Sequence, residues 1–364
     1  MKTMQIRSLL LSALIGIAVA GCSDRGSETP NRQQGSGLSS ASYFEVATPV
    51  KGSIFSLGEP IQVTISPKGN APEVDSVEVF LDGEKYTTQT ELSFTWDSEG
   101  AMVGRRIVRM VVYSGDKKEA LRFSTTLKSD IVPETWGYQV VSRYPHDTKA
   151  FTQGLIFQDG FLYEGTGQVG QSVLRKLNHQ SGEVLLQDDL DATMFGEGIT
   201  RVGDDIIQIT WKARTGIVYD YNTLEEKSRF TYSTEGWGLT YTGEELVMSD
   251  GSNKLHFLNA DSYVLNRTID VYDDQGPVKN LNELEMIDGH LYANVWMTDK
   301  IAKIEVETGR VLAYIDMTGL LPENERNGQE DVLNGIAYDA DKKRVYLTGK
   351  NWPALFEVQW FKKS

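Results

Sequence analysis

The sequence predicts an all-β protein in which a small immunoglobulin-like β-sandwich precedes a five-bladed β-propeller. Two observations lead to this prediction. Short runs of alternating apolar and polar residues, separated by Gly, Asp, Asn and Ser turns, cover nearly the whole chain after residue 42, as in antiparallel hairpins. From about residue 136 the runs form five similar units spaced 40 to 52 residues apart, which is close to the size of a four-stranded propeller blade.

The first segment, residues 1–22, has the features of a secretory signal. Lys2 and Arg7 precede an uncharged apolar run at 9–20, which is too short to span a bilayer comfortably. The run ends in Val-Ala-Gly-Cys, which resembles the bacterial lipobox, whose cysteine is lipidated and becomes the mature N-terminus. Cys22 is the only cysteine of the chain. We therefore expect an exported cell envelope lipoprotein, periplasm-facing or anchored in the outer membrane; an ordinary signal peptide with a chance cysteine is the alternative.

Cysteine, histidine and charge exclude several classes of site and partner. One cysteine allows no disulfide framework, no cysteine-type zinc site and no thiol nucleophile in the folded part. The four histidines are scattered without a His-x-x-x-His pair, so we expect surface or loop histidines and neither a metal nor another cofactor. The formal net charge of −15 argues against a nucleic-acid partner, because phosphates would be repelled.

Two segments separate the signal from the propeller. Residues 23–42 are rich in Ser, Gly and polar residues, so they cannot bury a core and are expected to form a flexible linker. Residues 43–130 show alternating runs with hairpin turns at 82–83 and 114–116, which predicts the immunoglobulin-like sandwich without the cysteine pair of antibody domains. This domain carries no recognisable chemistry, and we interpret it as a spacer or docking module.

The remaining residues, 136–364, are expected to form the propeller and to carry the catalytic site. The five units align on one frame position, occupied in turn by Gly154, Gly198, Gly238, Glu283 and Gly335. The fifth unit ends after three strands, and residues 138–144 are expected to supply its fourth strand and close the ring, which removes exposed sheet edges. An eight-stranded sandwich pair or an open barrel is the weaker alternative.

In a propeller the first strand of each blade lines the central channel, so the residues just before the frame position converge at one mouth. They are Gln153, Glu197, Trp237, Asn282 and Asn334. The loops after the second strands add a second ring, consisting of Trp211, Asp250, Trp296 and Lys350. Apolar walls with a few convergent polar groups are typical of a small-molecule pocket.

Structural roles compete with functional ones for several of these residues. Tryptophans at repeating positions also pack blade against blade, Asp250 precedes a glycine and is able to cap a turn, and Asn334 is able to bond to backbone in its own blade. Glu197 differs, because a carboxylate between two glycines in a channel-facing loop has little packing purpose. It is the leading candidate for acid and base chemistry.

Several motifs occur together in a fixed order, namely YPHDTKAFTQGL, YEGTGQVGQSVLR, FGEGIT, EGWGLT, LNELE, NVW, LNGIAYD and LTGKNWP. The set resembles the plant-type and bacterial glutaminyl-peptide cyclotransferases, which are five-bladed propellers. The resemblance covers about residues 138–360 and leaves the sandwich outside. It implies a metal-independent enzyme that converts the N-terminal glutamine of peptides and proteins to pyroglutamate with release of ammonia.

Carried over by motif, the resemblance implies a site made of Phe151, Gln153, Glu197, Trp211, Trp237, Asn282, Trp296 and Lys350. The residue types suit the reaction. The α-amine attacks its own side-chain carboxamide, which mainly requires confinement by aromatic walls. Glu197 is expected to move a proton from the amine to the departing nitrogen, with its pKa raised by those walls. Gln153 and Asn282 are expected to donate hydrogen bonds to the developing oxyanion, and Lys350 to orient the substrate or tune the proton transfer.

Two other functions remain open at this point. Five-bladed propellers also hydrolyse glycosides with paired carboxylates, but here the inner ring offers only Glu197, since Glu235 and Glu283 are offset in the frame. A surface-anchored propeller that binds peptide termini without catalysis is the second alternative.

Overall fold

The computed structural model describes residues 42–363. The signal predicted for residues 1–22, with Cys22, and the linker predicted for residues 23–42, except residue 42, lie outside this part. The described residues form strands β1 to β28 and one 3-10 helix, η1 (Glu323–Glu325), so the predicted all-β class is confirmed. None of their helices has the length and hydropathy needed to cross a membrane.

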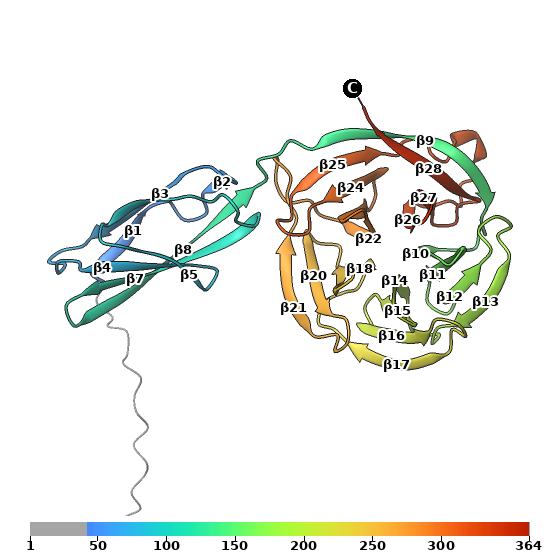
Figure 1. Ribbon diagram of the computed structural model, residues 1–364, viewed down its shortest axis with the longest axis horizontal. Helices are drawn as coiled ribbons and strands as arrows, with labels where there is room; N and C mark the ends of the chain where they lie inside the picture. The colour runs from blue at the N-terminus through green and yellow to red at the C-terminus, as the bar shows by residue number, and fades with distance from the viewer. Residues whose placement is uncertain (1–41, 364) are drawn as a thin grey trace, which may run out of the picture. The chain divides into compact units, whose positions relative to one another are not determined.

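The N-terminal strands form a sandwich of a three-stranded sheet, β1-β3-β6, and a five-stranded sheet, β2-β8-β7-β4-β5 (Figure 1). Its strands are β1 (Phe44–Thr48), β2 (Ile54–Ser56), β3 (Ile61–Pro67), β4 (Ser76–Leu81), β5 (Glu84–Gln89), β6 (Ser93–Trp96), β7 (Gly104–Ser114) and β8 (Lys117–Lys128). Alternate side chains of β3 and β7 meet in the core, among them Ile61, Val63, Val108 and Met110. The period-two pattern of the sequence thus corresponds to one buried face in each sheet.

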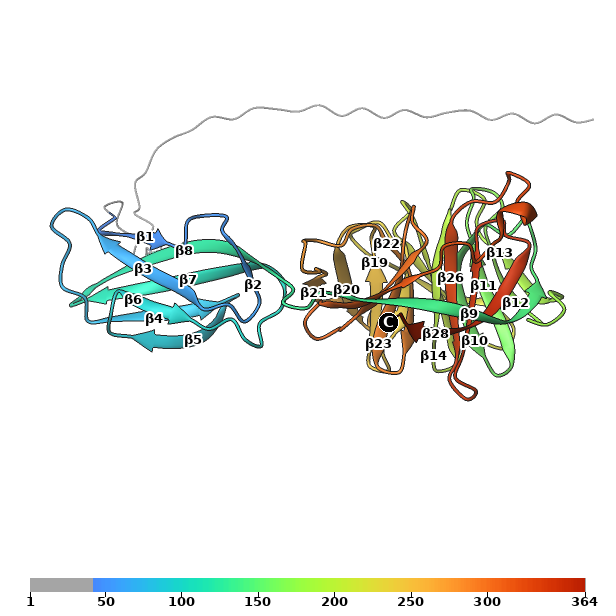
Figure 2. The same ribbon diagram turned by 90° about the horizontal axis from the view of Figure 1, so that it is seen from above.

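The remaining strands form a ring of five units, seen face-on in Figure 1 and edge-on in Figure 2. Unit 1 contains β10 (Thr152–Gln158), β11 (Phe161–Thr166), β12 (Val173–Leu177) and β13 (Val184–Asp189). Unit 2 contains β14 (Gly196–Val202), β15 (Asp205–Thr210), β16 (Thr215–Asp220) and β17 (Glu226–Thr231). Unit 3 contains β18 (Leu239–Tyr241), β19 (Glu245–Ser249), β20 (Lys254–Asn259) and β21 (Leu265–Asp270). Each of these units is a separate four-stranded antiparallel sheet.

Units 4 and 5 share one eight-stranded sheet, because β9 (Glu134–Pro145) lies between them. Unit 4 contains β22 (Leu281–Ile287), β23 (His290–Val295), β24 (Lys300–Ile304) and β25 (Val311–Asp316), and unit 5 contains β26 (Leu333–Asp339), β27 (Arg344–Gly349) and β28 (Ala354–Lys362). β9 pairs antiparallel with β28 and, at its first residues, parallel with β25. The prediction that residues 138–144 complete the last unit is therefore confirmed.

The first strands of the five units, β10, β14, β18, β22 and β26, stand closest to the centre of the ring (Figure 1). Each of them contacts the first strand of the next unit, and β26 contacts β10. A Cβ atom added to Gly154 would lie 2.5 Å from the backbone nitrogen of Ile199, and one added to Gly238 would lie 2.0 Å from the carbonyl oxygen of Asn282. The frame glycines therefore recur because neighbouring inner strands meet backbone to backbone at this level.

Glu283 occupies the frame position of unit 4, where the other units have glycine. Its carboxylate accepts hydrogen bonds from the backbone N–H groups of Leu155 in unit 1, at 3.3 Å, and Ile336 in unit 5, at 2.9 Å. The side chain is buried, and burial together with the charge of Glu285 raises the pKa of Glu283 well above its usual range. One side chain thus ties three inner strands together from the middle of the ring.

Candidate active site

The residues before the frame position stand where the chain enters the inner strands. Gln153, Glu197, Asn282 and Asn334 are each the second residue of their strand and are at most 5% exposed, while Trp237 lies two residues before β18 and is partly buried. Burying four polar side chains costs free energy unless each of them forms hydrogen bonds with the protein or with a ligand. Their common position makes this level of the ring the candidate site.

The loops after the second strands are fixed beside these residues by a recurring backbone hydrogen bond. The N–H group of Trp211 donates to the carbonyl of Phe195 at 3.0 Å, that of Trp296 to Asn280 at 2.8 Å, and that of Lys350 to Val332 at 3.0 Å. In each case the acceptor lies two residues before the inner-ring residue of the same unit. The structure therefore brings the two predicted rings together in units 2, 4 and 5 by the same local geometry.

Glu197 and Lys350 form the charged part of the site. Both side chains are 5% exposed. Burial raises the pKa of Glu197 well above its usual range; the charge of Lys350 opposes this effect and that of Glu235 adds to it. Burial lowers the pKa of Lys350, against the opposing charges of Glu197 and Asp331. Burial therefore disfavours the charged form of each group, and the opposite charge of its partner partly offsets this effect.

Two of the amide side chains, those of Asn334 and Gln153, are oriented by hydrogen bonds. The Nδ2 atom of Asn334 donates to the carbonyl of Thr152 at 3.0 Å and to Oε1 of Gln153 at 3.2 Å. Because its oxygen is engaged, Gln153 has its NH2 group left to serve a substrate. The expected alternative, a hydrogen bond from Asn334 to the backbone of its own unit, is wrong, because both of these hydrogen bonds go to unit 1. The Oδ1 atom of Asn282 is buried and has no hydrogen-bond partner among residues 42–363.

The aromatic residues of the site form two packed groups. Phe151 and Phe195 pack edge to face with centroids 6.1 Å apart, and Phe195 packs in the same way against Trp211 at 5.6 Å. In the second group Trp237 and Trp296 pack edge to face at 5.4 Å. The tryptophans therefore pack against other aromatic residues of the site, which combines the packing role and the wall role considered for them.

Glu235 joins the two groups and was not among the residues selected from the sequence. Its Oε2 atom accepts a hydrogen bond from Nε1 of Trp211 at 2.7 Å and another from Nε1 of Trp237 at 3.2 Å. The sequence offered one signal for this role, namely that Glu235 lies two residues before Trp237 of the inner ring. The alignment of the units could not reveal the hydrogen bond to Trp211, because Trp211 belongs to the preceding unit.

Asp250 has a structural role in the described residues. Its Oδ1 atom accepts hydrogen bonds from the backbone and the hydroxyl of Ser252, as a turn cap does, and its Oδ2 atom contacts Nε2 of His256 at 2.8 Å. The capping alternative is thus confirmed. His256 is 7% exposed within β20, so the expectation of surface or loop histidines is wrong at this position. Within residues 42–363 no group of three or more His, Cys, Asp or Glu side chains is arranged to hold a metal ion.

Comparison with known proteins agrees with this architecture. The family model for glutamine cyclotransferases matches residues 117–360. The chain belongs to the glutamine cyclotransferase family. It is 39% identical over 228 residues to a glutaminyl-peptide cyclotransferase of Arabidopsis thaliana, an alignment that covers 61% of this chain and 70% of the plant protein. It is 35% identical to the glutaminyl cyclase of Myxococcus xanthus, whose crystal structure superposes with a TM-score of 0.61 and covers 64% of this chain and 100% of that one.

In this member of the glutamine cyclotransferase family a second domain precedes the ring. A model for bacterial Ig domains matches residues 44–116, which confirms the immunoglobulin-like character predicted for the sandwich. The cyclotransferase match starts at residue 117, in the last sandwich strand β8, whereas the sequence motifs indicated a start at about residue 138. Both predicted sets of site residues lie within the matched region.

Proposed function

We propose that this glutamine cyclotransferase converts the N-terminal glutamine of peptides and proteins to pyroglutamate with release of ammonia. The observation that carries the proposal is the environment of Glu197, a buried carboxyl with a raised pKa beside a buried lysine and directed amide groups. The names of the plant and Myxococcus relatives support the same reaction.

The reaction requires one proton to move over a short path. The α-amine nitrogen forms a bond to the side-chain amide carbon, and the carbonyl π electrons move to the oxygen. When the carbonyl re-forms, the bond to the amide nitrogen breaks, and this nitrogen leaves as ammonia after gaining a proton. We assign Glu197 as the shuttle that accepts a proton from the attacking amine and delivers it to the departing nitrogen.

The electrostatics of the site favour this transfer. A free α-amino group has a pKa of roughly 7.7 to 8.0, and proton transfer is most efficient between groups of similar pKa. Burial raises the pKa of Glu197 well above its usual range, which makes its carboxylate a stronger base than an exposed one. An ordinary surface carboxylate would be too weak a base for the same task.

The developing negative charge on the carbonyl oxygen has two candidate donors. The oxygen of Gln153 accepts from Asn334, so its NH2 group is the part of the amide that would serve as a donor, and the Asn282 amide is 2% exposed at the equivalent position of unit 4. One well-placed donor contributes about 3 to 4 kcal/mol of transition-state stabilisation. Lys350 would orient the substrate or tune the proton transfer through its charge.

The aromatic walls would select the reactive rotamer of the glutamine. Cyclisation is intramolecular, so confining the side chain near the amine removes much of the entropic barrier. Phe151, Trp211, Trp237 and Trp296 supply rigid apolar surface for this purpose, and Glu235 holds two of the indoles.

The purified protein is to be incubated in EDTA with a glutamine-initiated dipeptide and with the same dipeptide acetylated at its N-terminus. We expect ammonia and pyroglutamyl product from the free dipeptide alone, because the acetylated nitrogen is not nucleophilic. Tight binding of the free peptide without ammonia would instead indicate a non-catalytic binding module, and activity on a chromogenic glycoside would indicate a hydrolase.

We also propose that the protein is an exported lipoprotein anchored through Cys22 in the cell envelope. The basic start, the apolar run at 9–20 and the small residues before the single cysteine support this proposal. Metabolic labelling with a fatty acid should mark the wild-type chain and not Cys22→Ala. Labelling of both, or of neither, would contradict the anchor.

A further inference from the structure

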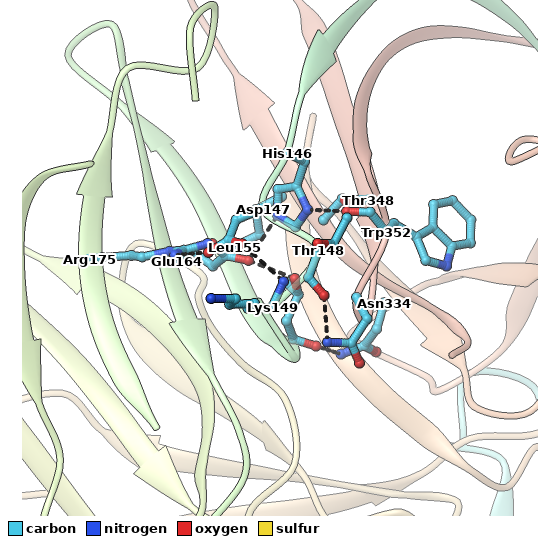
Figure 3. Close-up of polar contacts among 12 residues, drawn as sticks. His146, Asp147, Thr148, Lys149, Leu155, Glu164, Arg175, Asn334, Thr348 and Trp352 are labelled. Carbon is cyan, nitrogen blue, oxygen red and sulfur yellow. Dashed lines mark hydrogen bonds and ion pairs between the residues drawn. The ribbon is translucent and has the colours of Figure 1, made fainter. Parts of the chain in front are cut away.

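A buried cluster of charged residues lies beside the site in unit 1 (Figure 3). Glu164 is its centre: Oε1 accepts from the hydroxyl of Thr152 at 2.6 Å and contacts Nε2 of His146 at 3.1 Å, and Oε2 accepts from Nε of Arg175 at 2.8 Å. Arg175 also bonds to Asp147 at 3.0 Å. The side chains of Glu164, His146 and Arg175 are 0%, 3% and 6% exposed.

The cluster joins two chain segments that we call the entry segment, residues 146–153, and the lysine segment, residues 350–353. The Nδ1 atom of His146 donates to the carbonyl of Trp352 at 2.8 Å while Nε2 faces Glu164, and the backbone N–H of His146 donates to the carbonyl of Pro353 at 3.1 Å. His146 therefore connects the centre of the cluster to the lysine segment. His146 lies in the loop after β9, which agrees with the expectation of a surface or loop histidine, but its side chain is buried there.

The two segments carry residues of the site. Lys350 begins the lysine segment, and its Nζ atom lies 4.8 Å from the centre of the Phe151 ring in the entry segment. The backbone N–H of Asn351 donates to the carbonyl of Ala150 at 2.7 Å, next to that ring. A displacement of one segment relative to the other would thus change the position of the ammonium group over the ring and of Gln153 in the inner ring.

Thr152 links the cluster to the strand itself. It is the first residue of β10 and lies between Phe151 and Gln153, where the pairing of β10 with β11 shifts register. The hydrogen bond from Thr152 to Glu164 therefore anchors the backbone between the two site residues at an irregular point of the strand.

The charged groups of the cluster shift one another's pKa values. Burial alone would lower the pKa of His146, but the charge and hydrogen bond of Glu164 outweigh it and raise this pKa. Burial alone would raise the pKa of Glu164, and the charges of Arg175 and His146 instead hold it well below its usual range. The carboxylate of Glu164 therefore pairs with the Arg175 guanidinium and favours the protonated form of His146, while Asp147 bonds to Arg175. Buried ion networks contribute little net stability compared with apolar packing, so stability alone is a weak reason for this arrangement.

We propose that Glu164 and His146 are a positioning pair that holds the entry segment against the lysine segment and so sets the placement of Lys350. The proposal rests on the proposed cyclotransferase function for its kinetic consequence. Neither residue needs to touch the substrate, because each acts through the segment to which it is bonded.

The kinetic test compares Thr152→Val with Thr125→Val in the full-length protein. The second threonine is a matched control in the sandwich: it is 1% exposed and donates to the carbonyl of Ser53 at the same distance of 2.6 Å. We expect similar losses of thermal stability in both variants. Only Thr152→Val should lose kcat, by about tenfold or more, because small misplacements of reacting groups carry large penalties. Unchanged kcat in Thr152→Val, or an equal loss in the control, would overturn the proposal.

A second test does not depend on turnover. The titration of Lys350 is followed by its reaction with an amine-directed reagent and peptide mass spectrometry, in the wild type, in His146→Ala and in His146→Gln. In the alanine variant Lys350 should gain water, and its pKa should rise toward the ordinary value. The glutamine variant retains a donor for Glu164 and should restore the wild-type titration.

An identical titration in all three proteins would overturn the positioning role even if the wild type is active. Absence of ammonia release by the wild type would count against the proposed function only, since the titration of Lys350 still decides the placement.

Discussion

Replacing Glu197 by Gln separates the chemical role of this carboxyl from its effect on stability. Gln keeps the shape of the protonated side chain but cannot ionise, so it cannot carry a proton from the amine to the leaving nitrogen. Loss of a positioned acid or base lowers turnover by about 10²- to 10⁴-fold, which corresponds to about 2.7 to 5.4 kcal/mol in the barrier. We expect a decrease in kcat within this range.

The effect on stability has the opposite sign. Burial raises the folded-state pKa of Glu197 above the ordinary value of 4.5, so the folded protein retains a proton that the unfolded chain releases. Stability of the wild type therefore falls as the pH rises from the ordinary pKa to the folded one, by about 1.4 kcal/mol for each unit between the two. Glu197→Gln lacks this contribution, whereas that of Glu283 remains in both proteins. The variant should be as stable as the wild type in acid and more stable in mild alkali.

The assay combines ammonia release with thermal unfolding of both proteins at an acidic and a mildly alkaline pH. Glu197→Asp is a useful companion variant, because it keeps the ionisable group but retracts it from the site. Near wild-type turnover in Glu197→Gln would refute the shuttle. A variant less stable than the wild type in alkali would refute the account of the raised pKa.

Three further predictions follow from the described contacts. Glu235→Ala removes the common acceptor of two indoles and should raise KM for glutamine dipeptides about tenfold or more, whereas Glu235→Gln keeps an acceptor and should have a KM close to that of the wild type. Both variants lose a negative charge near Glu197, so the acidic limb of the pH–rate profile should move to lower pH. Gly238→Ala places a methyl group 2.0 Å from the carbonyl oxygen of Asn282 and should lower the free energy of unfolding by about 3 kcal/mol. Gly203→Ala is the control: its methyl group meets open space, and only the strain of a positive φ of 58° should lower the free energy of unfolding, by about 1 kcal/mol; denaturant titration measures both variants. The raised pKa of His146 contributes stability that is complete below its ordinary pKa of 6.5 and is lost as the pH rises through the folded-state pKa. The free energy of unfolding, measured in denaturant from mildly acid to alkaline pH, should therefore decrease toward alkaline pH, and it should decrease less in His146→Gln.

Local patterns of the sequence were sufficient to predict the strands. The alternation in β3 and β7 and the glycines of the hairpin turns are properties of neighbouring residues, so they can be read without knowing the fold. The frame glycines marked the inner strands of four units for the same reason. The shared frame, with Glu283 in unit 4, also located Gln153, Glu197 and Asn282 at equivalent positions of their units.

Residues whose partners are far away in the chain could not be read in this way. Glu283 was only an irregular frame position in the sequence, and its hydrogen bonds to Leu155 and Ile336 exist because ring closure brings three inner strands together. The role of Glu235 depends on an indole of the preceding unit, and that of His146 on a segment about two hundred residues later. Hydrogen bonds of this kind leave no period in the sequence.

The sequence by itself determined the β class, the repeating units, the strand that completes the last unit and the family to which the ring belongs, because each is recorded in the order and spacing of nearby residues. The tertiary structure alone decided which polar groups are buried and what they contact, because burial and the pKa of Glu197, Lys350 and His146 depend on surroundings assembled from several units.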